Sequence, residues 1–266
     1  MVNLGLGSAC RECAPRPARP IRMAAMKWME AMPRLRPGKE GYPWRVFFAY
    51  LGAAIAFRYL CHSLMLIPVL LNELRPAPTV PDLLLSIVPR LDWLAHINYY
   101  LWIACYFPPA LYLLYRARGL FARFILIDGA ISLTRGLMIP LTGLGPPFGA
   151  DINALRPFDL WPTWWKLVDP FRALFGDAAG IYLTKDMFFS GHIATTFLLY
   201  LFSRRLSRRE SGVFLALHLF SLLVVFFSHL HYTIDVIGAY AITFTMFTLG
   251  DRWLCRRFPG LAARGL

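Results

Sequence analysis

The 266-residue sequence is 58% hydrophobic and 15% aromatic, and only 16% of its residues are charged. An ordinary soluble domain carries more charge and fewer aromatic residues, so the composition indicates a membrane protein. The formal net charge is +13, but the basic residues interrupt apolar segments and do not form one solvated face. We therefore expect no nucleic-acid partner and infer that the basic residues meet anionic lipid headgroups.

The N-terminal segment 1–45 is rich in arginine and proline and has no compact apolar stretch of the kind found in a signal peptide. Its composition predicts a disordered, basic cytosolic tail. Residues 46–255 are predicted to form one catalytic membrane domain, and residues 256–266 a short cytosolic C-terminal tail.

Six segments within 46–255 are apolar and long enough to cross a bilayer, which takes about 20 helical residues. The sequence therefore predicts an all-α fold, a polytopic membrane protein built as a bundle of six transmembrane helices. The predicted spans are approximately 46–71, 93–114, 120–142, 187–203, 212–228 and 233–254.

The distribution of positive charge predicts how these spans are oriented. With six spans, both termini lie on one side of the membrane. Most lysines and arginines fall near the two termini and in segments 115–123 and 203–211, and positively charged segments stay in the cytosol. We therefore expect cytosolic termini. The fourth and sixth spans then begin at the opposite surface, which faces a lumen, the periplasm or the exterior.

Two polar motifs occur at the starts of those spans, Ser190-Gly191-His192 and His231-Tyr232-Thr233-Ile234-Asp235. His231 and Asp235 are four residues apart, so they share one helix face. A carboxylate that accepts from one imidazole nitrogen leaves the other nitrogen free as a nucleophile. The alternative is a polar pair that only seals the helix start. The cost of ionisable groups inside a span favours the catalytic interpretation.

The first motif supplies a second catalytic group and a place for phosphate. His192 is predicted to protonate a leaving alcohol and later to deprotonate the acceptor. Gly191 allows a ligand close to the backbone, and the amides that follow Ser190 attract phosphate oxygens.

Two further side chains are candidates for substrate binding. Arg135 lies in the outer half of the third span, where its guanidinium suits a phosphoryl group, and the alternative is a structural pairing with Asp128. Asp186 is the acidic residue nearest His192 in the long segment 143–186. Together with the tryptophans there, it could hold a quaternary ammonium or ethanolamine group, although such tryptophans usually only anchor in lipid headgroups.

These motifs resemble the sphingomyelin synthase family, a branch of the type-2 phosphatidic acid phosphatase superfamily. Segments 185–192 and 231–236 are similar to its third and fourth motifs. Segment 123–146 is similar to its second motif, and Pro81-Asp82 is a faint match to its first. The resemblance covers roughly residues 45–255, and the six predicted spans agree with it.

The resemblance implies a catalytic triad formed by the two histidines and the aspartate. It also implies transfer of phosphocholine or phosphoethanolamine from a glycerophospholipid donor to ceramide, or to diacylglycerol as in a related plant branch. Thr184-Lys185-Asp186 stands where animal synthases tend to have Cys-Gly-Asp, which leaves the headgroup and the acceptor open. The predicted site comprises catalytic His192, His231 and Asp235 and substrate-binding Arg135, Asp186, Lys185, Ser190 and Gly191, with no metal and no cofactor.

Two alternatives remain at this stage. One is a lipid phosphate phosphatase, but Val224-Val225, Gly149 and Phe189 stand where that family usually has Ser-Arg, lysine and proline. The other is a lipid transporter or gate without catalytic activity. The oligomeric state does not follow from the sequence.

Overall fold

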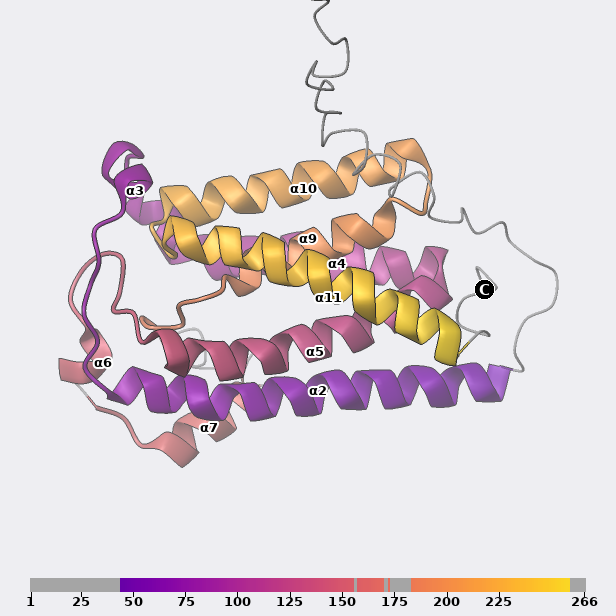
Figure 1. The fold of residues 1–266 in the computed structure, drawn as a ribbon, viewed down its shortest axis with the longest axis horizontal. Helices are drawn as coiled ribbons and strands as arrows, with labels where there is room; N and C mark the ends of the chain where they lie inside the picture. Colours follow the sequence, from indigo (N-terminus) through magenta and orange to yellow (C-terminus); the bar gives the residue numbers. More distant parts are fainter. Residues whose placement is uncertain (1–43, 156, 170–171, 173–182, 259–266) are drawn as a thin grey trace, which may run out of the picture. The chain divides into compact units, whose positions relative to one another are not determined.

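The computed structural model describes residues 44–155, 157–169, 172 and 183–258. The predicted N-terminal tail lies outside the described residues except for 44–45, as do residues 259–266 of the predicted C-terminal tail. Every regular element within the described residues is a helix, as the all-α prediction requires (Figure 1).

Each of the six predicted spans corresponds to a helix. The corresponding helices are α2 (Trp44–Leu74), α4 (Asp92–Arg116), α5 (Arg118–Thr142), α9 (Gly191–Ser203), α10 (Arg208–Phe227) and α11 (Thr233–Arg257). The short helices are α3 (Leu83–Ile87), α6 (Ile152–Leu155) and α7 (Leu160–Val168).

Among the described residues, α2, α5, α10 and α11 are long and apolar enough to cross a membrane. Helix α4 has 25 residues, but its first turns carry Asp92, His96 and Asn98, which reduce its apolar character. Helix α9 is apolar but has only 13 residues. It begins at Gly191, after the cap residue Ser190, and is therefore shorter than the predicted span 187–203. The six-span count and its orientation therefore stay predictions.

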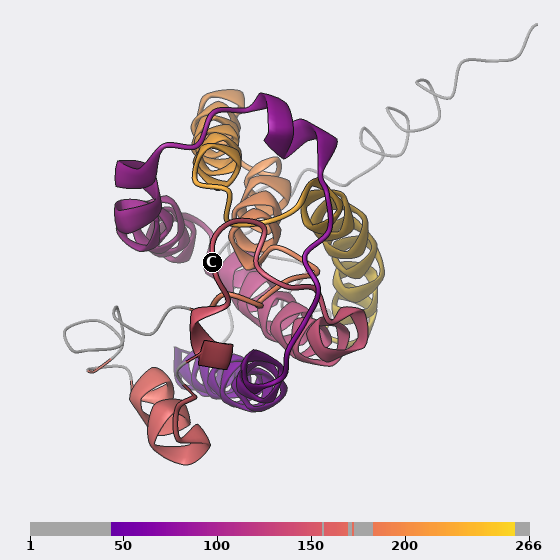
Figure 2. The ribbon, with the colours of Figure 1, turned by 90° about the vertical axis from the view of Figure 1, so that its left-hand side faces the viewer.

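Helix α2 makes its most extensive contact with α5, and the two lie side by side (Figure 1, Figure 2). Glycines of α5 permit this approach. A Cβ atom on Gly136 would lie 2.8 Å from Met65 Cα, and one on Gly129 would lie 3.1 Å from Arg58 Cα. Small residues that bring two backbones close together are typical of helix pairs in membranes, where van der Waals packing drives association.

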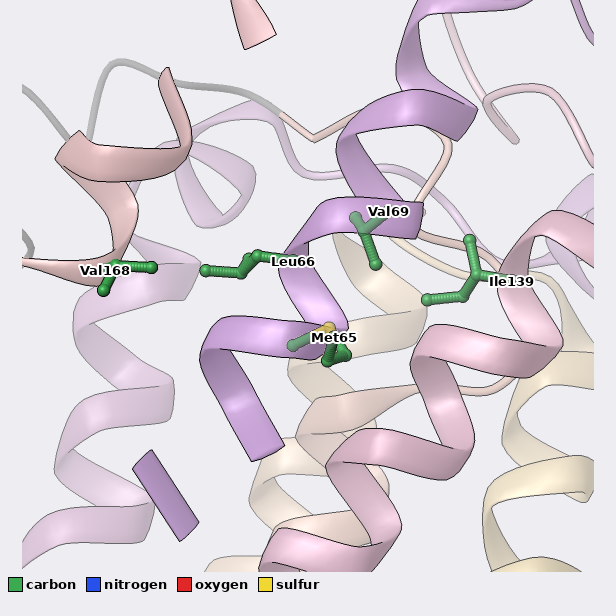
Figure 3. Packing of buried hydrophobic residues seen from close by; sticks show 5 residues of the cluster. All are labelled: Met65, Leu66, Val69, Ile139 and Val168. Carbon is green, nitrogen blue, oxygen red and sulfur yellow. The ribbon is translucent and has the colours of Figure 1, made fainter. Parts of the chain in front are cut away.

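A buried apolar cluster continues this contact toward the site (Figure 3). It joins helices that are distant in the sequence and so fixes the C-terminal half of α2. Its members are Met65, Leu66 and Val69 of α2, Ile139 of α5 and Val168 of α7.

Buried charges inside the bundle are paired across helices. Arg58 of α2 forms an ion pair with Asp128 of α5. Asp128 therefore has a partner other than Arg135, and the structural pairing considered for Arg135 is not formed. Nearer the start of α5, the buried guanidinium of Arg123 lies 2.8 Å from Asp251 of α11. Such pairing is required because an isolated charge in an apolar interior is very costly.

Replacing Gly136 tests the close contact between α2 and α5. Gly136→Ala should destabilise the fold by about 1–3 kcal/mol, because the new methyl group overlaps backbone atoms that cannot move cheaply. Thermal unfolding in detergent measures the loss. Gly52→Ala on α2 is the matched control, since its Cβ would have no heavy atom within 4 Å, and it should be neutral or stabilising. Equal midpoints for the two variants would contradict the packing described here.

Candidate active site

The candidate site lies at the end of the bundle where α9 and α11 begin, toward the left of Figure 1 and facing the viewer in Figure 2. The two motifs are brought together by backbone bonds. The Ser190 amide donates to the Asp235 carbonyl at 3.2 Å. The Ser190 hydroxyl caps α9 by accepting from the Ile193 amide at 3.4 Å. The structure thus joins two segments that are forty residues apart.

The Asp235 carboxylate is fully buried and connects three parts of the site. Its Oδ1 accepts from the Phe188 amide and its Oδ2 from the Tyr232 amide, each at 3.0 Å. The same Oδ2 lies 3.4 Å from His231 Nδ1. Hydrogen bonds from two amides stabilise the ionised carboxylate. Asp235 therefore presents negative charge to one nitrogen of His231 and leaves Nε2 on the other side of the ring.

The rings of His192 and His231 are neighbours, with their centroids 6.1 Å apart and their planes inclined by 64° in an edge arrangement. His231 is only 4% exposed. Within the described part of the chain, His192 Nε2 is a buried nitrogen without a hydrogen-bond partner, whereas His231 Nδ1 lies beside the Asp235 carboxylate. Buried polar atoms are normally satisfied, so orphaned ones indicate a functional position.

Arg135 reaches the site from α5. Its Nε donates to the Phe189 carbonyl and its Nη2 to Asp186 Oδ1, each at 2.8 Å. A Cβ atom on Gly191 would lie 2.7 Å from Arg135 Nη1, so the guanidinium rests directly against the first residue of α9. The structure therefore places Arg135, Asp186 and Gly191 beside His192.

Lys185 lies next to this group but its side chain is directed elsewhere. Its ammonium group is fully buried and donates to Asp151 Oδ2 and to the Arg75 carbonyl, each at 2.6 Å. The Lys185 amide and the Thr184 hydroxyl donate to Glu73 at 2.6 and 3.0 Å. These contacts attach the segment before Asp186 to the end of α2 and make Lys185 a positioning group.

Asp82 is a residue whose role the sequence barely indicated. Its Oδ2 accepts from the Thr233 amide at 2.6 Å, and its Oδ1 accepts from the Thr233 hydroxyl at 2.9 Å and from the amides of Leu84 and Leu85. Asp82 thus caps α3 and holds the start of α11, two residues from His231. The faint match of Pro81-Asp82 to a family motif was the only signal for it.

Two other histidines have partners outside this pair. The buried His218 contacts the Thr196 hydroxyl and the Tyr240 hydroxyl inside the bundle, in agreement with a structural role. His229 Nε2 contacts the Val88 carbonyl at 2.9 Å. In the portion of the chain that the structure describes, no three His, Cys, Asp or Glu side chains converge to form a potential metal site.

Known proteins share these segments. Residues 185–252 match the family model described as PAP2 superfamily C-terminal, and this range contains both histidines and Asp235. The chain is 27% identical over 214 residues to Sphingomyelin synthase-related protein 1 of Homo sapiens, covering 77% of this chain and 51% of that protein. It is 28% identical over 210 residues to Phosphatidylcholine:ceramide cholinephosphotransferase 2 of Homo sapiens, covering 71% and 56% respectively.

The chain spans about half the length of the curated relatives it matches. These similarities confirm the resemblance to the sphingomyelin synthase-like branch of the PAP2 superfamily. Together with the four long apolar helices, they support an integral membrane protein.

Removing the charge of Asp82 should loosen the start of α11. Burial raises the pKa of Asp82, but hydrogen bonds from Thr233, Leu85 and Leu84 outweigh it and hold that pKa below its ordinary value. The ionised carboxylate therefore stabilises the fold above the ordinary pKa of an aspartate, and this contribution disappears as the pH falls through the lowered pKa. Asp82→Asn should unfold at a lower temperature than the wild type at neutral pH.

Thermal unfolding in detergent from neutral pH to about pH 3 checks this, because the difference between wild type and variant should narrow at the acidic end. Asp92→Asn is the control. Asp92 pairs with Arg90, but its side chain is 72% exposed, and exposed pairs contribute little. A pH-independent difference for Asp82→Asn would contradict the charge-based explanation.

Proposed function

We propose that this protein is a membrane phosphotransferase that moves phosphocholine or phosphoethanolamine from a glycerophospholipid to the hydroxyl group of ceramide or diacylglycerol. The observation that carries the proposal is the pair of neighbouring imidazoles with ring centroids 6.1 Å apart, where Asp235 contacts His231 and Arg135 lies against the residue before His192. The similarity to sphingomyelin synthase-like proteins supports the same class of reaction.

In the first half of the reaction, His231 Nε2 attacks the donor phosphorus. A nitrogen–phosphorus bond forms, and the bond between phosphorus and the diacylglycerol oxygen breaks. His192 donates its proton to that oxygen, so diacylglycerol leaves as a neutral alcohol. Asp235 orients His231 and stabilises the positive charge that develops on its ring. The product on the protein is a phosphohistidine that carries the headgroup.

In the second half, neutral His192 removes the proton from the acceptor hydroxyl. The acceptor oxygen attacks phosphorus, and the bond from phosphorus to His231 breaks. This returns both histidines to their starting states, so the two substrates use one site in turn and ping-pong kinetics are expected.

Arg135 and Asp186 are proposed to bind the two charges of the headgroup. The guanidinium of Arg135 pairs with phosphate oxygens through its planar fork. Phosphate then competes with Asp186 for Arg135, and the partly exposed Asp186 carboxylate, with 24% of its side chain accessible, becomes available to the cationic end of the headgroup. Gly191 contributes its amide at the start of α9, and Ser190, whose own amide is bonded to Asp235, contributes by capping this helix. Lys185 acts indirectly by holding Asp186 in place.

The orientation of the site is proposed from the charges at the opposite helix ends. Arginines gather where α4, α9 and α11 end and where α5 and α10 begin. They are Arg116, Arg118, Arg204, Arg205, Arg208, Arg209, Arg252, Arg256 and Arg257. A basic end of this kind stays in the cytosol. Cytosolic termini and a site facing a lumen, the periplasm or the exterior follow from it.

Replacing the nucleophile tests the enzymatic proposal directly. His231→Ala should reduce turnover by at least about a thousandfold while the unfolding midpoint stays close to that of the wild type. Purified protein is incubated with fluorescent ceramide or diacylglycerol and with phosphatidylcholine or phosphatidylethanolamine in turn, and product mobility identifies the donor and the acceptor. The exposed His96 of α4 provides the control, and His96→Ala should retain full activity.

The covalent intermediate has its own readout. A donor labelled with radioactive phosphorus, supplied without acceptor, should leave acid-labile label on the wild type and none on His231→Ala. Lipid movement across vesicles without product formation would instead identify a transporter or gate. Release of free phosphate or phosphoalcohol as the main product would identify a phosphatase.

Displacing Arg135 without mutating it tests its role as phosphate clamp. Gly191→Ala places a methyl group against Arg135 Nη1 and should push the guanidinium away from the start of α9. We expect kcat/KM to fall by roughly 10- to 100-fold, since removal of one preorganised donor costs that much or more. Gly212→Ala on α10 is the control because its Cβ would meet nothing within 4 Å. Unchanged kcat/KM in Gly191→Ala would refute the clamp.

A further inference from the structure

An aromatic pair on α4 borders the site, and no motif pointed to it. The indole of Trp102 and the imidazole of His192 have their centroids 5.5 Å apart, with planes inclined by 61°. Inclined aromatic rings at this separation attract each other edge to face, by about 0.5–1.5 kcal/mol per pair. Trp102 therefore borders the His192 imidazole directly and limits the positions that this ring can adopt.

Trp102 also fixes the backbone that carries His192. Its indole N–H donates to Thr195 Oγ1 at 3.2 Å. The Thr195 hydroxyl in turn donates to the Gly191 carbonyl at 2.9 Å. The indole thus contacts α9 twice, once through the imidazole ring and once through the first turn of the helix.

The ring of Trp102 is itself held in place by Tyr106, one turn later on α4. It stacks on Tyr106, with ring centroids 5.3 Å apart and planes within 9° of parallel. The buried Tyr106 hydroxyl donates to Asp128 Oδ2 at 3.2 Å, and Asp128 is ion-paired with Arg58. A continuous set of contacts therefore runs from α2 through α5 and α4 to His192 on α9.

We propose that Trp102 and Tyr106 are positioning residues that hold the His192 imidazole, and its proton, against the departing diacylglycerol oxygen. The inference rests on the proposed function, because it assigns these residues to the proton-donating step alone. His231 does not share these contacts, so its attack on phosphorus should not depend on them.

A comparison of two phosphocholine donors distinguishes this positioning role from a merely structural one. Phosphatidylcholine releases an alkoxide that must be protonated, whereas p-nitrophenyl phosphocholine releases nitrophenolate, which leaves without a proton. If ethanolamine proves to be the transferred headgroup, the corresponding ethanolamine pair is used. The rate of phosphohistidine formation is measured for both donors, as labelled protein for the lipid and as the burst of nitrophenolate for the ester.

Tyr106→Phe removes only the hydroxyl that anchors the stack, and Trp102→Phe removes the N–H and reduces the ring contact with His192. Both variants should slow the lipid reaction by about 2- to 10-fold, the range that an edge-to-face aromatic contact supports, and leave the nitrophenolate burst unchanged. Tyr240→Phe is the matched control, because it removes a tyrosine hydroxyl that contacts an imidazole away from the site, His218. It should leave both rates unchanged.

His192→Ala separates failure of this inference from failure of the proposed function. A large loss with the lipid and a retained burst with the ester supports His192 as proton donor. If His192→Ala slows both donors equally, its proposed role is wrong. In a further outcome, His192→Ala slows the lipid reaction alone while Tyr106→Phe and Trp102→Phe slow the reactions of both donors equally or slow neither reaction. In that case only the positioning role is overturned. Should Trp102→Phe fail to fold, Tyr106→Phe decides alone, since it changes a single oxygen atom.

Discussion

The candidate site depends on the buried carboxylate of Asp235. Through one side chain and its own carbonyl, Asp235 bonds to Phe188, Tyr232 and Ser190 and lies against His231. Without it, the segment before α9 and the segment before α11 would lose the hydrogen bonds that join them. Because this carboxylate is bonded to backbone amides, its position is set by the chain and not by flexible side chains. The two imidazoles meet as a consequence.

Around this anchor, each charged group at the site is held by a distant part of the chain. Arg135 of α5 is paired with Asp186. Lys185, which precedes Asp186, forms an ion pair with Asp151 and a hydrogen bond to the residue that follows α2. Charges in an apolar interior require such partners. The same requirement preorganises the site, because each group has one favourable position before substrate arrives.

The bundle separates two chemical environments along its helices. One end carries the imidazoles, carboxylates and the arginine of the site, and the other carries a set of exposed arginines. Between them, the ion pair of Arg58 and Asp128 and the aromatic pair of Trp102 and Tyr106 link the apolar interior to the site. Residues far from the reacting atoms can thus influence the proton donor through rigid contacts.

The sequence by itself determined the helices and the motif at the start of α11, because both depend on local patterns. Apolar stretches predict helices, and the four-residue spacing places His231 and Asp235 on one face. Only the tertiary structure decided the length of α9, where the Phe188 and Ser190 amides bond to Asp235 before the helix begins. It also decided the partners of Arg135 and Lys185, the anchoring of α11 by Asp82 and the contact of Trp102 with His192. These partners lie 34 to 151 residues apart, and a local pattern carries no information about which distant side chain will satisfy a buried charge.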